Sequence, residues 1–141
     1  MRRPICAAVA ALASLLGCGS ATDPSTAINF DGTYVAASST PVNGGTSPLV
    51  SSRMDFGPGG RTFTRTDVVA LPDGTQRTAT QAYGCRGTRA EFACTAPYPS
   101  GGVYEEDGTS TGDGFTLRRR IWLTAQTTGP SVLVDVRYGR R

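Results

Sequence analysis

Short alternating runs of apolar and polar residues, separated by turn-forming residues, fill most of this chain. Between residues 28 and 138, groups rich in Gly, Pro, Asp and Ser recur about every 10–17 residues and divide the sequence into eight segments. None of these segments has a helical period, and their Thr, Val and aromatic content favours strands. The pattern therefore predicts an all-β domain.

Two segments near the C-terminal end alternate most clearly. In residues 115–125, Phe115, Leu117, Ile121 and Leu123 fall on one face, which Arg119 interrupts. In the last segment, every second residue is apolar: Val132, Val134, Val136 and Tyr138. A turn at residues 127–130 joins the two segments. Because the connection is so short, we expect the two strands to be antiparallel neighbours.

Residues 62–69 alternate less regularly, because Arg65 and Asp67 fall on the same face as Phe63 and Val69. We expect this segment to be an edge-like or strongly twisted strand. The other expected strands are residues 32–35, 49–56, 75–83, 88–93 and 102–106.

No segment of the domain could serve as a helix that covers an open sheet, so the strands have to bury their apolar faces against one another. An antiparallel meander achieves this by closing on itself, which also removes exposed strand edges. We therefore predict an eight-stranded antiparallel up-and-down barrel over residues 28–139. The alternative is a two-sheet β-sandwich.

A short apolar run lies near the start of the chain. It follows Arg2 and Arg3 and ends in Leu15-Leu16-Gly17-Cys18. The run is shorter than the roughly 20 apolar residues that span a bilayer, and its positive start is typical of a secretory leader. Its last four residues resemble the lipobox of bacterial lipoproteins, whose leader is cut before a cysteine that then carries the lipid.

The lipobox resemblance implies lipidation at Cys18 and anchoring in the bacterial cell envelope. Each buried methylene of the acyl chains contributes about 0.8 kcal/mol of membrane affinity, so attachment is expected to be lasting. The residue that follows the lipidated cysteine is Gly19 rather than an aspartate. In bacterial lipoproteins this implies transfer to the outer membrane. An ordinary leader cut near Ala21 is the alternative. The resemblance divides the chain into signal peptide, tether and barrel domain, at residues 1–17, 18–27 and 28–139.

Two cysteines remain in the barrel domain once Cys6 leaves with the leader and Cys18 is acylated. In an oxidising compartment, Cys85 and Cys94 are expected to form a disulfide. The loop of about ten residues that it closes corresponds to roughly 2.5–3 kcal/mol of stabilisation. A metal or redox pair is the alternative, but the spacing is not that of a CxxC motif and the chain has no histidine to complete a zinc site.

The charge of the chain gives no sign of a nucleic-acid partner. Without Arg2 and Arg3, 12 arginines face 11 acidic side chains. Nucleic-acid binding normally needs a concentrated basic face, and the tightest cluster is residues 118–120. A solvated strand face explains that cluster.

The lack of any histidine removes the commonest general base and the commonest metal ligand. A carboxylate pair could still catalyse hydrolysis, and residues 105–107 (Glu-Glu-Asp) are the only acidic cluster. Neighbouring glycines indicate an exposed turn, where no burial raises a carboxylate pKa. We therefore expect a non-enzymatic protein without a metal or cofactor.

Gly32-Thr33-Tyr34 in the first expected strand and Arg137 in the last resemble the lipocalin and calycin arrangement. In those families a Gly-x-Trp motif enters the barrel, and an arginine from the last strand packs over the aromatic ring. The resemblance implies that the barrel binds a small hydrophobic ligand, with Tyr34 and Arg137 near the ligand site.

Arg119 is a third candidate for ligand binding, because it points inward between Leu117 and Ile121. A buried arginine needs a partner, so it could orient an anionic head group. A salt bridge with an inward Asp or Glu, or a bulge that turns Arg119 outward, would also explain it.

Two functions remain open for this predicted monomer. In the first, a lipid-anchored barrel binds a small hydrophobic ligand in the envelope. In the second, the barrel is solid and the protein contacts another envelope protein. An open apolar cavity that reaches the barrel mouth would favour the first, and an interior filled by large side chains from every strand would favour the second.

Overall fold

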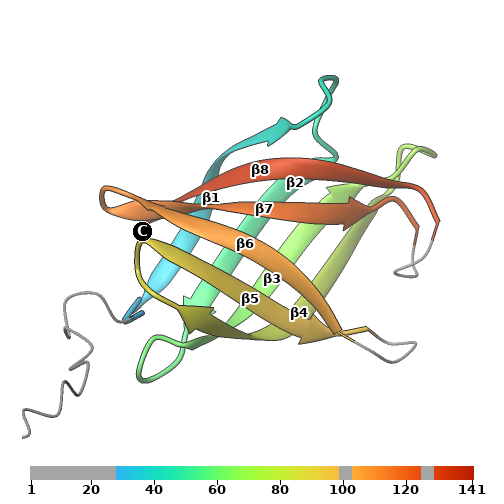
Figure 1. Cartoon of the computed structure of the whole chain (residues 1–141). Helices are drawn as coiled ribbons and strands as arrows, with labels where there is room; N and C mark the ends of the chain where they lie inside the picture. Colours follow the sequence, from blue (N-terminus) through green and yellow to red (C-terminus); the bar gives the residue numbers. More distant parts are fainter. Residues whose placement is uncertain (1–27, 99–102, 125–128) are drawn as a thin grey trace, which may run out of the picture.

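A computed structural model describes residues 28–98, 103–124 and 129–141 of the chain. These residues form only strands and their connections (Figure 1), so the predicted all-β class is confirmed. The eight strands are β1 (Thr33–Pro41), β2 (Leu49–Phe56), β3 (Thr62–Ala70), β4 (Gln76–Gly87), β5 (Glu91–Pro97), β6 (Val103–Thr111), β7 (Gly114–Trp122) and β8 (Ser131–Arg140).

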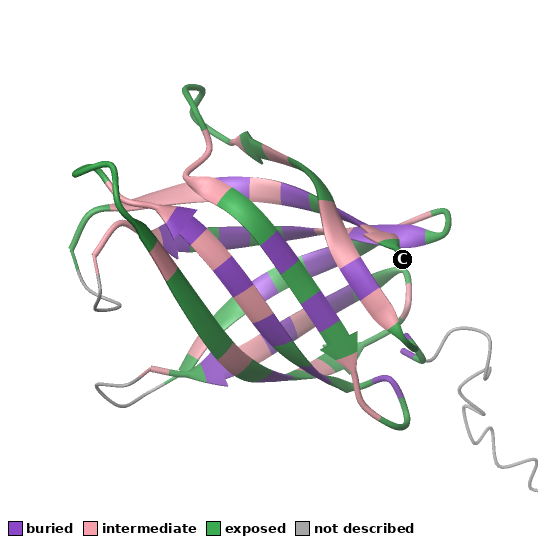
Figure 2. Ribbon diagram, turned by 180° about the vertical axis from the view of Figure 1, so that it is seen from behind, coloured by how far each residue is buried: buried purple, intermediate pink, exposed green. Residues whose placement is uncertain are grey.

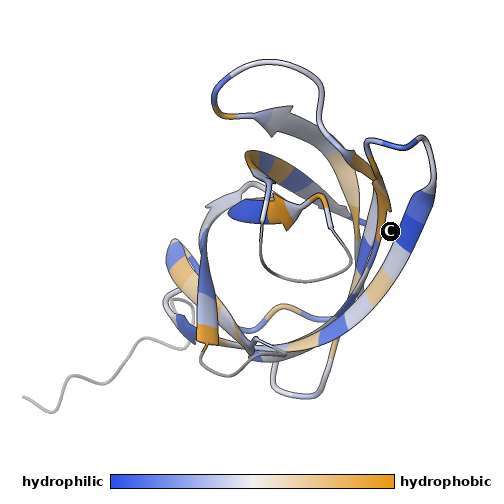
Figure 3. Ribbon diagram, turned by 90° about the vertical axis from the view of Figure 1, so that its right-hand side faces the viewer, coloured by the Kyte–Doolittle hydropathy of each residue, from blue (hydrophilic) through white to orange (hydrophobic). Residues whose placement is uncertain are grey.

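The strands form a closed antiparallel barrel in sequential order, as the sequence predicted. Each strand pairs with the next, and β1 pairs with β8 from Tyr34 opposite Arg140 to Pro41 opposite Val134. This last ladder closes the ring of strands seen along the barrel in Figure 3. Since β1 joins β8 in one continuous sheet, the alternative of two packed sheets is wrong.

Buried and more exposed residues alternate along most strands (Figure 2), as expected when successive side chains point to the interior and to the outer face in turn. On β7, Phe115, Leu117 and Ile121 are at most 3% exposed, whereas Arg118 between them lies on the outside. Burial of such side chains contributes roughly 1.5–3 kcal/mol each. The face assignment made for β7 from the sequence is confirmed, as is its antiparallel pairing with β8.

One end of the barrel is filled by aromatic side chains, and we call it the closed end. Phe30 lies just before β1, and its ring centroid is 4.8 Å from that of Phe115 and 5.2 Å from that of Phe92. Tyr34 and Phe56 lie against the same group. Tilted and edge-on contacts of this kind are favourable between aromatic rings.

The chain segment before β1 crosses the closed end because Gly60 leaves room for it. A Cβ atom on Gly60 would lie 2.3 Å from the carbonyl oxygen of Phe30, and the φ angle of Gly60 is +67°, which favours glycine. Ile28 and Phe30 are each only 2% exposed as a result. Arg141 also lies at this end, where its backbone N–H donates to the carbonyl of Thr33. Both ends of the described chain therefore lie at the closed end.

Residues 84–87 separate the strands expected at residues 75–83 and 88–93, but they form no turn, because they are the paired end of β4. Gly84 to Gly87 lie opposite Thr95 to Phe92 of β5. The expected disulfide between Cys85 and Cys94 is present in this ladder. The turn follows at residues 88–90, so β5 begins and ends later than the expected strand at residues 88–93.

The strand expected to end at Glu106 continues to Thr111 as β6. Gly108 does not break it, because the Phe92 ring on β5 occupies the space that a side chain would need. A Cβ atom on Gly108 would lie 2.3 Å from that ring. The glycine is covered by its cross-strand neighbour rather than exposed in a turn.

The expectation that residues 62–69 form an edge-like strand is also wrong. β3 is paired along its length with β2 on one side and with β4 on the other. Its irregular pattern has a different cause: Arg65 and Asp67 point into the barrel, where they are 3% and 8% exposed.

Candidate functional site

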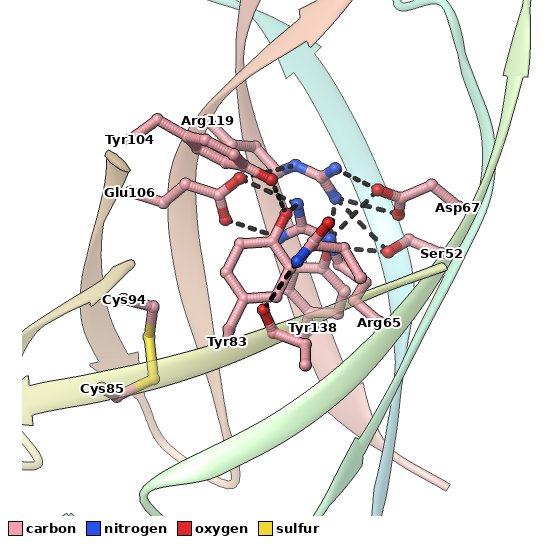
Figure 4. A network of polar contacts seen from close by, with 12 residues as sticks. Ser52, Arg65, Asp67, Tyr83, Cys85, Cys94, Tyr104, Glu106, Arg119 and Tyr138 are labelled. Carbon is pink, nitrogen blue, oxygen red and sulfur yellow. Dashed lines mark hydrogen bonds and ion pairs between the residues drawn. A yellow bond between two sulfur atoms is a disulfide. The ribbon is translucent and has the colours of Figure 1, made fainter. Parts of the chain in front are cut away.

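Four charged side chains meet in the middle of the barrel (Figure 4). Arg65 and Asp67 come from β3, Glu106 from β6 and Arg119 from β7, and none is more than 8% exposed. Period-two alternation places each of them on the inner face of its strand. Their formal charges cancel, and we call these four side chains the ionic layer.

Arg65 and Glu106 form the most direct pair of the ionic layer. The two terminal nitrogens of Arg65 donate to the two carboxylate oxygens of Glu106 at 2.5 and 2.8 Å. The Nε of Arg65 donates to Asp67 at 3.0 Å. This two-pronged geometry matches the planar guanidinium to the planar carboxylate, which is the strong form of a charged hydrogen bond.

Arg119 links the ionic layer to the opposite wall of the barrel. Its terminal nitrogens donate to both carboxylate oxygens of Asp67, one of them at 3.1 Å. One of these nitrogens also donates to the Tyr138 hydroxyl at 2.8 Å. Tyr138 is in turn 2.8 Å from the Ser52 hydroxyl. Strands far apart around the ring are therefore tied together through Arg119.

A pair of tyrosines extends the network toward the end of the barrel opposite the closed end. Arg65 donates to the Tyr83 hydroxyl, and the hydroxyl oxygens of Tyr83 and Tyr104 are 2.6 Å apart. Burial raises the pKa of Tyr83, and burial also raises the pKa of Tyr104. Both hydroxyls therefore keep their protons at neutral pH.

The arginines of the ionic layer and Asp67 shift one another's pKa values in the direction that favours their charged forms. Burial alone would raise the pKa of Asp67, but Arg119 and Arg65 outweigh it and lower that pKa to about 2. For Arg65, burial alone would lower the pKa, but Glu106 and Asp67 raise it well above its usual value. Asp67 is therefore ionised at neutral pH and forms ion pairs with the two arginines.

Acid should weaken the fold through Asp67. Its pKa is lower in the folded chain, about 2, than the ordinary value of 3.8. Its stabilising contribution is therefore complete above pH 4 and is lost as the pH falls toward 2. We expect a loss of about 2 kcal/mol in the free energy of unfolding over this interval, measured by denaturant titration followed by circular dichroism. The Asp67→Asn variant should lack this loss, and an equal loss in the variant would contradict the assignment.

The barrel interior beyond the ionic layer contains a cavity of about 180 Å³. Val69, Ala79, Ile121 and Tyr104 contribute to its wall, and all four charged residues of the layer line it. We call this half of the barrel the open end. A cavity of about 150 Å³ is large enough to hold benzene, so this cavity can hold a ligand with a single ring or a short chain.

Two arginines that line the cavity have hydrogen-bond donors without partners. The buried Nε of Arg119 makes no hydrogen bond; its nearest acid is Glu106, 3.7 Å away. The buried Nε of Arg77 also makes none. Arg77 belongs to β4, and its terminal nitrogen reaches across to the backbone carbonyl of Trp122 on β7 at 3.0 Å. Buried donors usually have hydrogen-bond partners. These two donors lack acceptors, and both belong to residues that line the cavity.

The three ligand-binding residues predicted from the sequence lie in three different places. Arg119 lines the cavity and points inward, and its salt bridge with Asp67 is one of the explanations the sequence left open. Tyr34 is buried in the aromatic group at the closed end. Arg137 is exposed on the outer face of β8, because Val136 and Tyr138 on either side of it point inward. The expected packing of Arg137 over Tyr34 is therefore wrong.

The predicted position of the acidic cluster is also wrong. Residues 105–107 were expected to lie in an exposed turn, but Glu106 is 1% exposed and points into the barrel from the middle of β6. The neighbouring Glu105 points outward and pairs with Arg86. One signal in the sequence could have revealed this. Arg65, Asp67 and Arg119 occupy inward positions on two strands and carry one excess positive charge, so a carboxylate from another strand had to balance it.

Within the described ranges, no three His, Cys, Asp or Glu side chains gather as a metal ion would require. The same residues contain no helix that is long and apolar enough to cross a membrane. Comparisons with models of protein families, with curated proteins and with solved structures found nothing that matches this chain.

Proposed function

We propose that this protein is a non-catalytic, lipid-anchored binding protein of the bacterial cell envelope, whose barrel takes up one small amphipathic molecule at its open end. The observation that carries this proposal is the cavity of about 180 Å³, in which apolar side chains lie beside unpaired donors. An apolar wall with a few convergent polar groups is the usual composition of a small-molecule site.

The barrel interior limits the size of the ligand. The closed end is filled by aromatic side chains, and the middle is filled by the ionic layer. A long acyl chain would have to displace buried ion pairs, which is costly because each remaining charge would lose its partner. The proposal therefore narrows the hydrophobic ligand expected from the lipocalin resemblance to a molecule of about the size of one aromatic ring.

The packed interior also supports the proposal that the protein is not an enzyme. Asp67 and Glu106 are the two carboxylates that line the cavity, and both accept hydrogen bonds from arginines. A general acid needs a raised pKa, and the pKa of Asp67 is lowered instead.

Binding at the open end can be tested by nuclear magnetic resonance on isotope-labelled protein, with benzyl alcohol and benzoate as probes. At least one probe should shift the backbone amide signals of Val69, Ala79 and Ile121, which line the cavity. The signal of Phe115, in the aromatic group at the closed end, should remain in place. Lack of any shift at the cavity residues with either probe would refute the proposed function.

A matched pair of variants on β4 locates the binding. Ala79 lies opposite the inward Asp67 in the β3–β4 ladder, whereas Ala82 lies opposite Thr64 on the other face. Ala79→Trp should fill the cavity and abolish the shifts, and Ala82→Trp should leave them unchanged. If both variants respond alike, the ligand binds elsewhere. The alternative function, contact with another envelope protein, requires instead a filled interior that binds no ligand.

The lipid anchor is a separate part of the proposal. It rests on the sequence around Cys18, which lies outside the described residues. Growth with labelled palmitate should label the native protein and leave a Cys18→Ala variant unlabelled. Label retained on the variant would contradict lipidation at this residue, whatever the outcome of the ligand experiment.

A further inference from the structure

Three hydrogen-bond donors belong to residues that line the cavity at the open end. Two are the unpaired Nε groups of Arg119 and Arg77, both of which belong to residues that line the cavity. The side chain of Arg119 is only 3% exposed, so water cannot freely solvate it. A buried N–H group without a hydrogen-bond acceptor carries a free-energy penalty that a ligand with an acceptor group would remove.

The third donor is the hydroxyl of Tyr104. The hydroxyl oxygens of Tyr83 and Tyr104 are 2.6 Å apart, and either can donate to the other. When Tyr83, which accepts a hydrogen bond from Arg65, donates its own hydrogen to Tyr104, the hydrogen of Tyr104 has no acceptor among the described residues. A hydroxyl at the end of such a chain is polarised by the guanidinium at its start. Tyr104 also lines the cavity, so this hydrogen is available to a ligand.

The charges around the cavity favour an anion. Its lining contains four arginines and two carboxylates. Arg65 and Arg119 are balanced by Glu106 and Asp67 within the ionic layer. The excess inside the barrel comes from Arg77, whose terminal nitrogen reaches the backbone carbonyl of Trp122, because Arg120 lies on the outer face of β7. An anion at this level would meet uncompensated positive charge before it approached the carboxylates below.

Apolar groups complete the cavity. Val69, Ile121 and Pro97 line it together with Ala79. A ligand that satisfied only the donors, such as inorganic phosphate, would leave these groups unused. A small organic acid, with an acidic head and an apolar body of one ring or a short chain, uses both kinds of surface.

We propose that the open end of the barrel binds a small organic carboxylate, whose head group accepts hydrogen bonds from Arg119, Arg77 and Tyr104. This inference rests on the proposed function and adds the class of ligand to it. Arg77 is the residue that selects for charge, because it brings positive charge without a carboxylate partner in the described structure. Arg119 and Tyr104 orient the head group.

The experiment compares benzoate with benzyl alcohol, which has a similar size and no charge. Calorimetric titration of the purified protein at neutral pH should give an affinity for benzoate about tenfold to a hundredfold higher, as expected for hydrogen bonds to a charged group. The Nε–H resonances of Arg119 and Arg77 should move with benzoate and stay in place with benzyl alcohol. These resonances report on the head group directly and require no substitution.

Variants then assign the selectivity to Arg77. Arg77→Gln should lower the affinity for benzoate about tenfold and leave that for benzyl alcohol unchanged. Arg86→Gln, an exposed arginine at the other end of β4, should change neither. Equal affinity for the two probes, or benzoate binding that does not change in Arg77→Gln, would overturn the carboxylate inference and leave the proposed function standing. Failure of both probes to reach the cavity would overturn both.

Discussion

The Glu106→Gln variant should lose about 3–5 kcal/mol of its free energy of unfolding, the range measured when one partner of a buried ion pair is removed. The substitution preserves the shape of the side chain but leaves the ionic layer with one excess positive charge. Glu106 is 1% exposed, so solvent cannot compensate that charge. Denaturant titration followed by circular dichroism measures the loss.

Glu105→Gln is the matched control, because Glu105 precedes Glu106 on β6 and points to the outer face. Its ion pair with Arg86 is exposed, and such pairs contribute less than about 1 kcal/mol. A double variant, Arg65→Met with Glu106→Leu, should recover most of the stability lost in Glu106→Gln, because the remaining charges of Arg119 and Asp67 are balanced. Equal losses in Glu105→Gln and Glu106→Gln would contradict the ionic layer.

The Phe115→Ala variant should also be destabilised by about 3–5 kcal/mol, because it leaves a cavity at the centre of the aromatic group. Phe115 is fully buried, and its ring lies within 6.0 Å of the rings of Phe30, Tyr34, Phe56, Phe92 and Tyr138. Loss of this one ring removes contacts with four strands and with the segment that crosses the closed end. The thermal or denaturant midpoint reports the effect.

Val103→Ala serves as the control for Phe115→Ala. Val103 is 68% exposed at the start of β6, so its truncation should change stability by no more than about 0.5 kcal/mol. A loss below about 1 kcal/mol in Phe115→Ala would show that the closed end is not the main hydrophobic core of the barrel.

The barrel could be predicted from the sequence because its strands are short, sequential and separated by regular turns. Two strand ends differ from the prediction for one shared reason: glycine is typical of turns, but here it lies within strands. Gly84 and Gly108 both lie within paired strands, and at Gly108 the ring of Phe92 fills the missing side-chain space. Local composition cannot reveal such a contact, since it depends on which strand lies beside the glycine.

The candidate site was only partly predictable. Arg119 could be placed inside the barrel from the alternation of β7, but its partners belong to β3 and β6 and are distant in sequence. The charges of Arg65 and Asp67 made β3 resemble an exposed strand, although they are buried as ion pairs. Charged residues that are exposed and charged residues that are buried in ion pairs give the same local sequence pattern. Which of the two applies depends on the contacts between distant strands that form when the sheet closes.

The position of the described ends has a consequence for how the protein would be oriented. The two ends of the described chain, Ile28 and Arg141, lie at the closed end of the barrel (Figure 1). The cavity lies toward the opposite end. A protein tethered to a bilayer through the residues before Ile28 would therefore turn its aromatic plug toward the lipid surface and its binding mouth toward the aqueous phase. Solutes could then enter from the water without passing through the membrane interface.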